Sequence, residues 1–430
     1  MVKSFKKILL KVVNLAFKIT IFLRIDILTV LILILLTKKC NNPGSQRKYK
    51  VLCLSKSVFN DDVNALAKKS KEIEYLLFPR LHLLAIFRQY FEYNDEVYTN
   101  YHLDEMYNSR RELLQKRYMR LLAGLKKLLK FDAILSGNFV YLSQQEFAFA
   151  ARNLGIPFIV LYKEGMAPVE SFEPFIKTYY NKVFTGDRIL FYNENIKDAL
   201  IKASVPGLED SISRVVGIPR LDLLKSIKPE SDAKMITLFS FFQKDKISSL
   251  FKDFVDVELL ERRSDEFHLN VIEFAKRHPE FKIVIKTKAG QTYVDYVHDL
   301  IGRYEVDLNI PNLIITNSLN VHSLIKRSVL VLGYMSTTLL ESLYLGVRIA
   351  SPDFSDMSRE IVFDYFTKNK ELVSYINCYD DLERAVQDAV RYQGYPPNSS
   401  KFLEEFCYKT DGRSCERVEK EILEVIKDVC

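Results

Sequence analysis

The stretch that decides the fold is SVLVLGYMSTTLLESLYLGVRIASPDF, residues 328–354. It opens with an apolar, β-branched run at 329–332, which predicts a strand. Capping residue types follow, and residues 338–344 then read as a short helix that stops at Gly346. Residues 347–350 read as a second strand. The stretch therefore predicts one strand–helix–strand unit of a parallel sheet.

The turn before this helix carries candidate chemistry. A helix start leaves N–H groups free, and with the hydroxyls of Ser336, Thr337 and Thr338 it forms an anion site. Glu341 lies one turn further on, where its carboxylate can accept from a ligand hydroxyl. The helix start offers hydrogen-bond donors for a diphosphate, and the carboxylate beside it offers an acceptor for the hydroxyls of a ribose. This combination predicts a nucleotide-sugar site. The alternative is an ordinary unit of any doubly wound protein, because Ser-Thr-Thr caps are common.

This stretch resembles the C-terminal donor-binding segment of GT-B glycosyltransferases and their relatives. In those proteins a Ser/Thr-rich turn, a Glu on the next helix and a Gly before the next strand recur, as Ser336, Glu341 and Gly346 do here. The resemblance implies an α/β fold of two Rossmann-like domains facing a cleft. It also implies a nucleotide-activated donor as substrate, with no cofactor and no metal ion.

A second motif, G-x-P-R-x-D at residues 217–222, follows a short predicted strand. It looks like the interdomain segment of bacterial CDP-glycerol glycerophosphotransferases and allied surface-polysaccharide biosynthesis proteins. Arg220 and Asp222 are therefore expected between the domains. A local ion pair or a helix cap is the alternative for both.

Two further strand exits are expected beside the donor. Ser240 ends the strand predicted at 234–242, where related enzymes hold the donor phosphate. Lys286 and Lys288 follow the strand predicted at 281–286, and their ammonium groups would neutralise a diphosphate. Related families place His-Pro after this strand, and the chain departs from that pattern. Either lysine could instead face solvent.

Glu164 is the candidate catalytic base. Glu164 lies in the loop after the strand predicted at 156–162, directly before Gly165. This loop is at the carboxyl end of the strand, where parallel sheets bind ligands. A transferase needs such a base for the acceptor hydroxyl. The alternative is a structural carboxylate paired with Lys163 or with an arginine.

The length of 430 residues predicts two domains. Strands and helices alternate in both halves, which predicts parallel sheets. We expect a first domain at 48–216 that binds the acceptor and a second at 217–397 that binds the donor. Residues 398–430 are expected to form a helix that packs back on the first domain.

Residues 1–47 form a basic and apolar segment followed by a polar linker. Lysines alternate with apolar residues up to Lys18, and residues 19–37 are apolar except for Arg24 and Asp26. Three interpretations stay open: a membrane-surface or re-entrant anchor, a single-pass helix whose two mid-segment charges compensate each other, and a cleaved signal peptide. The first is favoured, because fewer than the roughly 20 apolar residues needed for a span follow Asp26.

Other classes of function lack their markers. The net charge of +7 is concentrated near the start of the chain, so no nucleic-acid partner is expected. The six cysteines show neither C-x-x-C nor zinc spacing, which fits a reducing cytoplasm. Dinucleotide, P-loop, α/β-hydrolase and zincin motifs are missing, and no D-x-D pair leaves a strand. His322 is expected to be structural.

The sequence therefore predicts a transferase of cell-envelope polysaccharide synthesis, such as capsule synthesis, at the cytoplasmic face of the cell membrane. It would move a sugar or polyol phosphate from a nucleotide donor to a lipid-linked or envelope glycan acceptor. A nucleotide-sugar 2-epimerase of the same fold is the alternative enzyme. The non-enzymatic alternative is a catalytically inactive GT-B-like scaffold in an envelope assembly complex.

Overall fold

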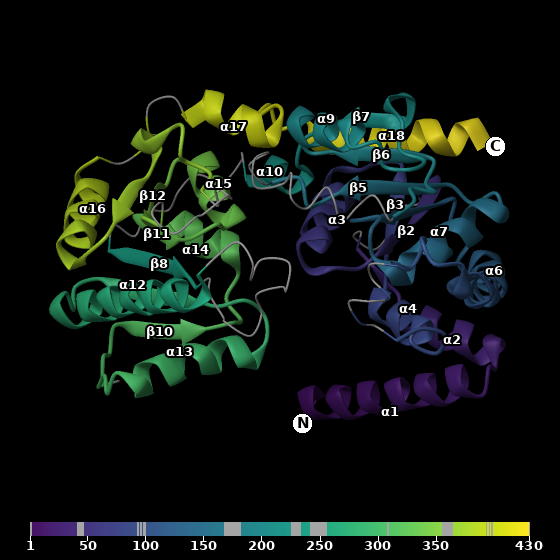
Figure 1. Ribbon diagram of the computed structural model, residues 1–430, viewed down its shortest axis with the longest axis horizontal. Helices are drawn as coiled ribbons and strands as arrows, with labels where there is room; N and C mark the ends of the chain where they lie inside the picture. The colour runs from purple at the N-terminus through teal and green to yellow at the C-terminus, as the bar shows by residue number, and fades with distance from the viewer. Residues whose placement is uncertain are drawn as a thin grey trace. The chain divides into compact units, whose positions relative to one another are not determined.

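The computed structural model describes residues 2–40, 47–92, 94, 97, 100–166, 182–224, 234–240, 256–307, 309–354, 364–392, 394, 396 and 399–429. The chain divides into two compact units (Figure 1). Unit 1 comprises Met1–Asp222 and Phe406–Cys430, and unit 2 comprises Leu223–Glu405. Each unit has its own apolar core around its own sheet.

Unit 1 is built on a seven-stranded sheet in the order β1-β3-β2-β4-β5-β6-β7. The core strands are continuous apolar runs, as in β5, whose five residues are all buried because helices cover both faces. The strands are β1 (Lys38–Lys39), β2 (Tyr49–Leu54), β3 (Ile73–Phe78), β4 (Ala133–Ser136), β5 (Phe158–Tyr162), β6 (Arg188–Phe191) and β7 (Ser213–Val215). The predicted parallel pairing is confirmed except at the edge, where β1 runs antiparallel to β3.

The helices of unit 1 come from both ends of the chain. The C-terminal helix α18 lies against α3 and β6, where Ser70 Oγ donates to Glu419 at 2.7 Å and Arg188 pairs with Glu421 at 2.5 Å (Figure 1). The helices are α1 (Val2–Phe22), α2 (Asp26–Leu36), α3 (Ser57–Lys69), α4 (Arg80–Phe87), α6 (Asn108–Leu129), α7 (Leu142–Asn153), α9 (Glu194–Lys202) and α18 (Ser414–Val429). α10 (Pro219–Leu224) begins in unit 1 and ends in unit 2.

Unit 2 is built on a six-stranded parallel sheet in the order β10-β9-β8-β11-β12-β13. The strands are β8 (Met235–Phe239), β9 (Lys282–Lys286), β10 (Leu313–Thr316), β11 (Leu330–Gly333), β12 (Arg348–Pro352) and β13 (Ser374–Ile376). The helices are α12 (Val257–Arg277), α13 (Gln291–Arg303), α14 (Val321–Arg327), α15 (Thr337–Tyr344) and α16 (Tyr379–Arg391). α17 (Ser399–Cys407) begins in unit 2 and ends in unit 1.

The two sheets are wound in the same way. In unit 1 the chain leaves β2 towards β3 on one side and returns to β4 on the other. In unit 2 it leaves β8 towards β9 and β10 and returns to β11 on the other side of β8. Each unit therefore has a topological switch point, between β2 and β4 and between β8 and β11. Open α/β sheets bind ligands outside the carboxyl ends of the strands at such a point.

The N-terminal segment differs from the single-pass interpretation. It forms two helices, α1 and α2, separated by a break at Arg24, whose φ is +55°. The charges at Arg24 and Asp26 do not compensate each other, because the Asp26 carboxylate pairs with Arg117 at 3.3 Å and Arg120 at 2.7 Å on α6. Within the described residues, every helix falls short of the length and apolar content that crossing a bilayer requires.

Several elements were not predicted. α4 lies in the aromatic-rich region after β3, and α13 follows β9. α17 is a separate helix before α18 within residues 398–430, where one helix is expected, and β13 adds an edge strand. The α13 sequence has the spacing of an amphipathic helix, with Val294, Val297, Leu300 and Ile301 buried on one face. The expected linker after Cys40 lies mostly outside the described residues.

Candidate functional site

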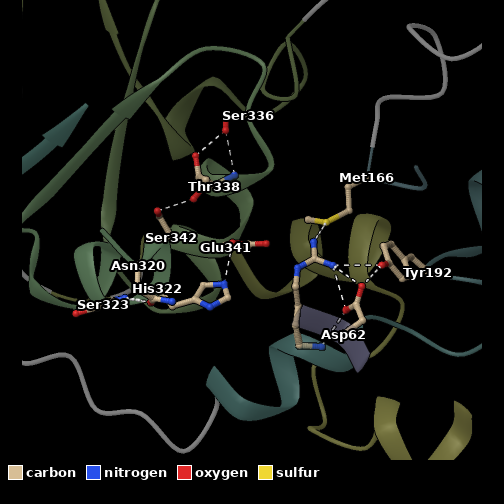
Figure 2. Close-up of polar contacts among 11 residues, drawn as sticks. Asp62, Met166, Tyr192, Asn320, His322, Ser323, Ser336, Thr338, Glu341 and Ser342 are labelled. Atoms are coloured by element: carbon tan, nitrogen blue, oxygen red, sulfur yellow. Dashed lines mark hydrogen bonds and ion pairs between the residues drawn. The ribbon is translucent and has the colours of Figure 1, made fainter. Parts of the chain in front are cut away.

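The turn between β11 and α15 forms as its sequence predicts. Ser336 caps α15: its Oγ accepts from the Thr338 N–H at 3.3 Å and contacts the Thr338 hydroxyl at 2.7 Å (Figure 2). Thr337 is the first residue of the helix and is half-buried. Met335, just before the cap, has a φ of +45°, a strained conformation of the kind that clusters at functional sites. The first turn of α15 holds no acidic residue that would oppose an anion.

Glu341 lies one turn into α15, and its side chain is 5% exposed. Its Oε2 lies 3.1 Å from Nε2 of His322 on α14 (Figure 2). A buried carboxylate needs such a partner, because an isolated charge in the interior is costly. His322 is thus a contact of the site that sequence reasoning treated as merely structural. The signal was its place in the first turn of a helix adjoining α15.

Ser240 follows β8, the strand beside β11. Its hydroxyl lies 3.0 Å from Nε2 of the buried His268, and its backbone N–H donates to the Lys286 carbonyl at 3.0 Å. Burial lowers the pKa of His268 to about 4, so its imidazole is neutral. Nδ1 contacts the Ser264 carbonyl at 2.7 Å and must carry the proton, so Ser240 donates to Nε2. The hydroxyl and the backbone N–H of Ser240 therefore both donate to groups inside unit 2. Phosphate binding by the hydroxyl stays a prediction, and it requires the Ser240 side chain to rotate away from His268. The loop after Ser240 lies outside the described residues.

Lys286 and Lys288 differ in their surroundings. Lys286 ends β9 and is 7% exposed, and its Nζ donates to the Thr287 carbonyl at 2.5 Å. Burial lowers the pKa of Lys286 below its ordinary value. Lys288 is exposed. Gly333 of β11 pairs with Phe239 of β8, which pairs with Lys286, so the three strand ends lie at one level of the sheet.

Unit 2 thus brings most of the predicted donor residues to the carboxyl edge of its sheet. The start of α15 and Ser240 flank the switch point between β8 and β11, and Lys286 lies one strand further along. Such an edge can hold a diphosphate through N–H groups, hydroxyls and an ammonium group. Among the described residues, no group of three or more His, Cys, Asp and Glu side chains is placed to hold a metal ion.

Glu164 lies at the carboxyl edge of the other sheet, in unit 1. Its Oε1 accepts from Asn138 Nδ2 and from the Tyr141 hydroxyl, each at 3.2 Å, and it pairs with Lys163. Burial raises the pKa of the Glu164 carboxyl, but the Lys163 ammonium and these hydrogen bonds outweigh burial and lower the pKa below its ordinary value. The carboxylate is ionised at neutral pH and is a weak base, since a general base works best with a pKa near 7.

Arg220 and Asp222 both make structural contacts within unit 1. The Arg220 guanidinium lies 3.2 Å from both carboxylate oxygens of the fully buried Asp62 and 3.2 Å from the Tyr192 hydroxyl (Figure 2). Asp222 caps α18 by accepting from the N–H groups of Ser414 at 3.1 Å and Cys415 at 2.6 Å. These are the contacts of the alternative given above, an ion pair and a helix cap.

No protein-family model matches the chain, and no curated protein matches it. Solved structures do match. A protein from Listeria monocytogenes assigned as a UDP-N-acetylglucosamine 2-epimerase shares 12% identity over 89% of this chain and 97% of its own, with a TM-score of 0.53. The UDP-GlcNAc 2-epimerase of Methanocaldococcus jannaschii shares 13% identity over 87% of this chain and 99% of its own, with a TM-score of 0.51.

The wall teichoic acid polymerase TagF shares 13% identity over 69% of this chain and 72% of its own, and its TM-score of 0.42 is too low to support an argument. The expected likeness to CDP-glycerol glycerophosphotransferases is therefore weaker than the likeness to 2-epimerases. At such low identities the matches establish the fold, a two-domain GT-B-like α/β fold with parallel sheets.

Proposed function

We propose that the chain is an enzyme of nucleotide-activated sugars and that unit 2 binds the nucleotide. The observation that carries this proposal is the capped start of α15 beside the switch point between β8 and β11, with Glu341 one turn further on. The positive end of a helix dipole with no acid in its first turn favours a diphosphate. The Lys286 ammonium on the same edge would balance part of its charge.

Glu341 would accept hydrogen bonds from the ribose hydroxyls. Its carboxylate already points to one side of α15, where His322 fixes it at 3.1 Å. A ribose would add charge-assisted hydrogen bonds, which contribute about 1.5–3 kcal/mol each. His322 acts here as a positioning residue, and no metal ion or cofactor is needed for this mode of binding.

The reaction we place first is epimerisation at C2 of a UDP-sugar. The structures with TM-scores above 0.5 reported above are UDP-GlcNAc 2-epimerases, and this chain spans nearly their full length. Inversion at C2 requires that the C2–H bond break and form again on the other face of the sugar. Glu164, the predicted base, is one candidate for taking or returning this proton.

Transfer to a membrane-bound acceptor is the second reaction, and the N-terminal helices favour it. The outward face of α1 carries Val12, Leu15, Ile19 and Phe22, which are 50–79% exposed. Exposed lysines at positions 11 and 18 accompany this face. Apolar residues beside lysines suit the surface of an anionic bilayer, at the cytoplasmic face of the membrane. An enzyme anchored there would act on a lipid-linked or envelope glycan acceptor, as in capsule synthesis.

Two measurements test this proposal. Thermal shift of the full chain with UDP, CDP, GDP and CMP should show stabilisation by at least one of them, since a ligand that binds only the folded state raises the melting temperature. UDP-GlcNAc should then yield its C2 epimer, followed by proton NMR. Nucleotide binding without an epimer favours the transferase, and binding of none of the four nucleotides favours the inactive scaffold.

A further inference from the structure

We propose that unit 1 rests on an anionic bilayer with the carboxyl edge of its sheet next to the lipid head groups. The first turns of α1 enter the bilayer and fix this orientation. The polar side chains of that edge, Glu164 among them, then act on the head group of a membrane lipid. The orientation is independent of the proposed function, whereas the lipid substrate rests on its second reaction, transfer to a membrane-bound acceptor.

One turn of α1 is left uncovered on all sides. Ile8, Leu9, Leu10 and Val12 are 51–58% exposed, and Lys11 among them is exposed as well. Successive residues of a helix point about 100° apart, so this run of five covers the whole circumference. The described parts of the chain thus leave an apolar turn in water, which is costly and indicates a partner surface.

The turns of α1 that follow pack firmly on unit 1. Phe17 and Ile21 belong to the core of this unit. The Phe17 ring lies 4.4 Å from the ring of His82 on α4, and Asn14 Oδ1 lies 3.2 Å from His82 Nε2. The uncovered turn therefore continues a helix that unit 1 holds in place, so a bilayer that takes up this turn also orients the unit.

The course of α1 leads to the carboxyl edge of the sheet. α4 begins at this edge, directly after β3, whereas α6 ends at the opposite edge, where β4 begins. α1 contacts the middle of α6 through the Ile21 carbonyl, which accepts from Arg117 Nη2 at 2.9 Å, and then the first turn of α4 through Asn14. Residues 8–12 continue beyond this contact, and α4 lies between α1 and the sheet (Figure 1).

The same edge carries the candidate base. Arg80 and His82 share the first turn of α4, and Arg80 Cζ lies 4.6 Å from the centre of the Tyr141 ring. The Tyr141 hydroxyl in turn contacts Glu164 Oε1 at 3.2 Å. A bilayer that takes up the uncovered turn therefore brings its head groups near Glu164, and a lipid-linked substrate can reach this edge without leaving the membrane.

Other exposed apolar side chains lie at the same end of unit 1. Leu81, on the first turn of α4, is 66% exposed. Leu103 and Met106, just before α6, are 65% and 63% exposed. They add apolar surface at the end of unit 1 that faces the lipid.

Charge identifies the partner surface as an anionic bilayer. The first 25 residues contain five lysines, one arginine and no acidic residue. Lys11 lies within the uncovered turn and Lys18 on an exposed part of α1. Long lysine side chains reach from an immersed turn to the head groups, where anionic lipid attracts them. A second copy of this chain would bring the same positive charge, so a bilayer is the better complement.

Photo-crosslinking to phosphatidylglycerol vesicles tests the orientation. Benzoylphenylalanine replaces Leu9 in the uncovered turn, Leu81 at the carboxyl edge, or Leu128, which is 54% exposed at the end of α6 and so at the opposite edge. We expect strong crosslinks to lipid from position 9, and about fivefold more from position 81 than from position 128, because only one edge faces the bilayer. Equal crosslinking from positions 81 and 128 would overturn the orientation.

Leu9→Glu with Leu10→Glu tests the contact itself. This double variant should co-sediment with the same vesicles about tenfold less than wild type, because two charges replace the apolar turn. Circular dichroism should show an unchanged fold, and the control Leu128→Glu should bind as wild type does. Undiminished binding of the double variant, or no binding of wild type, would exclude the turn as a membrane contact. A wild-type dimer that the double variant loses would assign the turn to a second copy instead.

Neither experiment depends on nucleotide binding. If wild type crosslinks as expected but none of the four nucleotides raises its melting temperature, the proposed function fails and the orientation stands. If a nucleotide binds but positions 9 and 81 crosslink no more than position 128, the nucleotide assignment stands and the membrane orientation is wrong.

Discussion

At the scale of single residues, unit 1 holds a buried ion pair between Asp62 and Arg220. The two charges neutralise each other, and Tyr192 completes their hydrogen bonds. A buried pair whose hydrogen bonds are satisfied in this way depends on both partners, because removing one leaves the other charge uncompensated.

We predict that Asp62→Ala destabilises unit 1 by about 3–5 kcal/mol, because it leaves the Arg220 guanidinium buried without its carboxylate. Urea unfolding followed by circular dichroism measures the change. Asp198→Ala, which removes an exposed carboxylate from α9, is the control and should cost less than about 0.5 kcal/mol. Equal effects of the two substitutions would contradict a structural role for the pair.

We predict that Glu341→Gln weakens UDP about tenfold while the protein stays folded, because the amide keeps the shape but loses the charge-assisted bond to ribose. Glu266→Gln is the matched control, since Glu266 is exposed on α12 of the same unit. Calorimetric titration gives both affinities. Unchanged affinity in Glu341→Gln would remove this residue from the donor site.

Lys56 gives a pH-dependent prediction. Its pKa is lowered in the folded protein by burial and by the cations Arg80 and Lys163, with Glu164 opposing. The unfolded chain therefore binds more protons than the folded one between the lowered pKa and the ordinary value of 10.5, and stability rises with pH across that window.

It follows that Lys56→Gln should melt at a higher temperature than wild type at pH 7, and that the difference should shrink as the pH approaches 10.5. Melting curves at both pH values measure the effect. A lower melting temperature at pH 7 would show that the Lys56 charge is compensated in the folded protein.

At the scale of elements, the sequence predicts helices and strands well where the spacing of apolar residues follows a single period without interruption. The unit at β11, α15 and β12 follows from its apolar runs, its Ser336 cap and Gly346, whose φ is +72°. The start of α12 at Val257 is marked by the Asp256 cap, whose side chain accepts from the Leu259 N–H, and the first half of this helix carries many charged residues rather than an apolar run.

The partners of charged residues could not be predicted from the sequence. Asp26 lies 91 residues from Arg117, and Asp62 lies 158 residues from Arg220. Such contacts depend on which helices the fold brings together, and no local pattern encodes them. For the same reason the sequence identified Glu164 but not its contacts with Asn138 and Tyr141, which follow a different strand.

The outward faces of α1 and α2 give a prediction at this scale. Deleting residues 1–40 is a poor test of membrane binding, because Phe17, Ile21, Val30 and Leu33 belong to the core of unit 1. We predict instead that Ile19→Glu with Phe22→Glu reduces binding to phosphatidylglycerol vesicles at least tenfold, since both side chains are exposed on the apolar face that we propose as the membrane contact.

Val390→Glu, at an apolar residue of α16 that is 40% exposed, is the matched control. It should bind vesicles as wild type does. Co-sedimentation at two salt concentrations measures the fraction of protein bound to the vesicles. This fraction should fall as salt is added, because salt screens the attraction between the lysines and the anionic lipid. Equal binding of the double variant and wild type would exclude this face as the membrane contact.

At the scale of the whole molecule, the two units repeat one design. Each has a parallel sheet wound in both directions from a central strand, and each presents polar side chains at the carboxyl edge beside its switch point. The chain passes between the units after Asp222 and again before Phe406. The alternation of strands and helices predicted this architecture, because parallel sheets require crossover helices. The fold alone does not determine which ligand such an edge binds, because that depends on the chemistry of its side chains.

Hydrogen–deuterium exchange of the full chain with and without saturating UDP tests the central claim most directly. Ligand contacts to backbone N–H groups slow exchange locally. The account predicts slower exchange at residues 333–345, the turn and helix of α15, and at 285–288 at the end of β9. Exchange in both segments that is unchanged by bound UDP would contradict it.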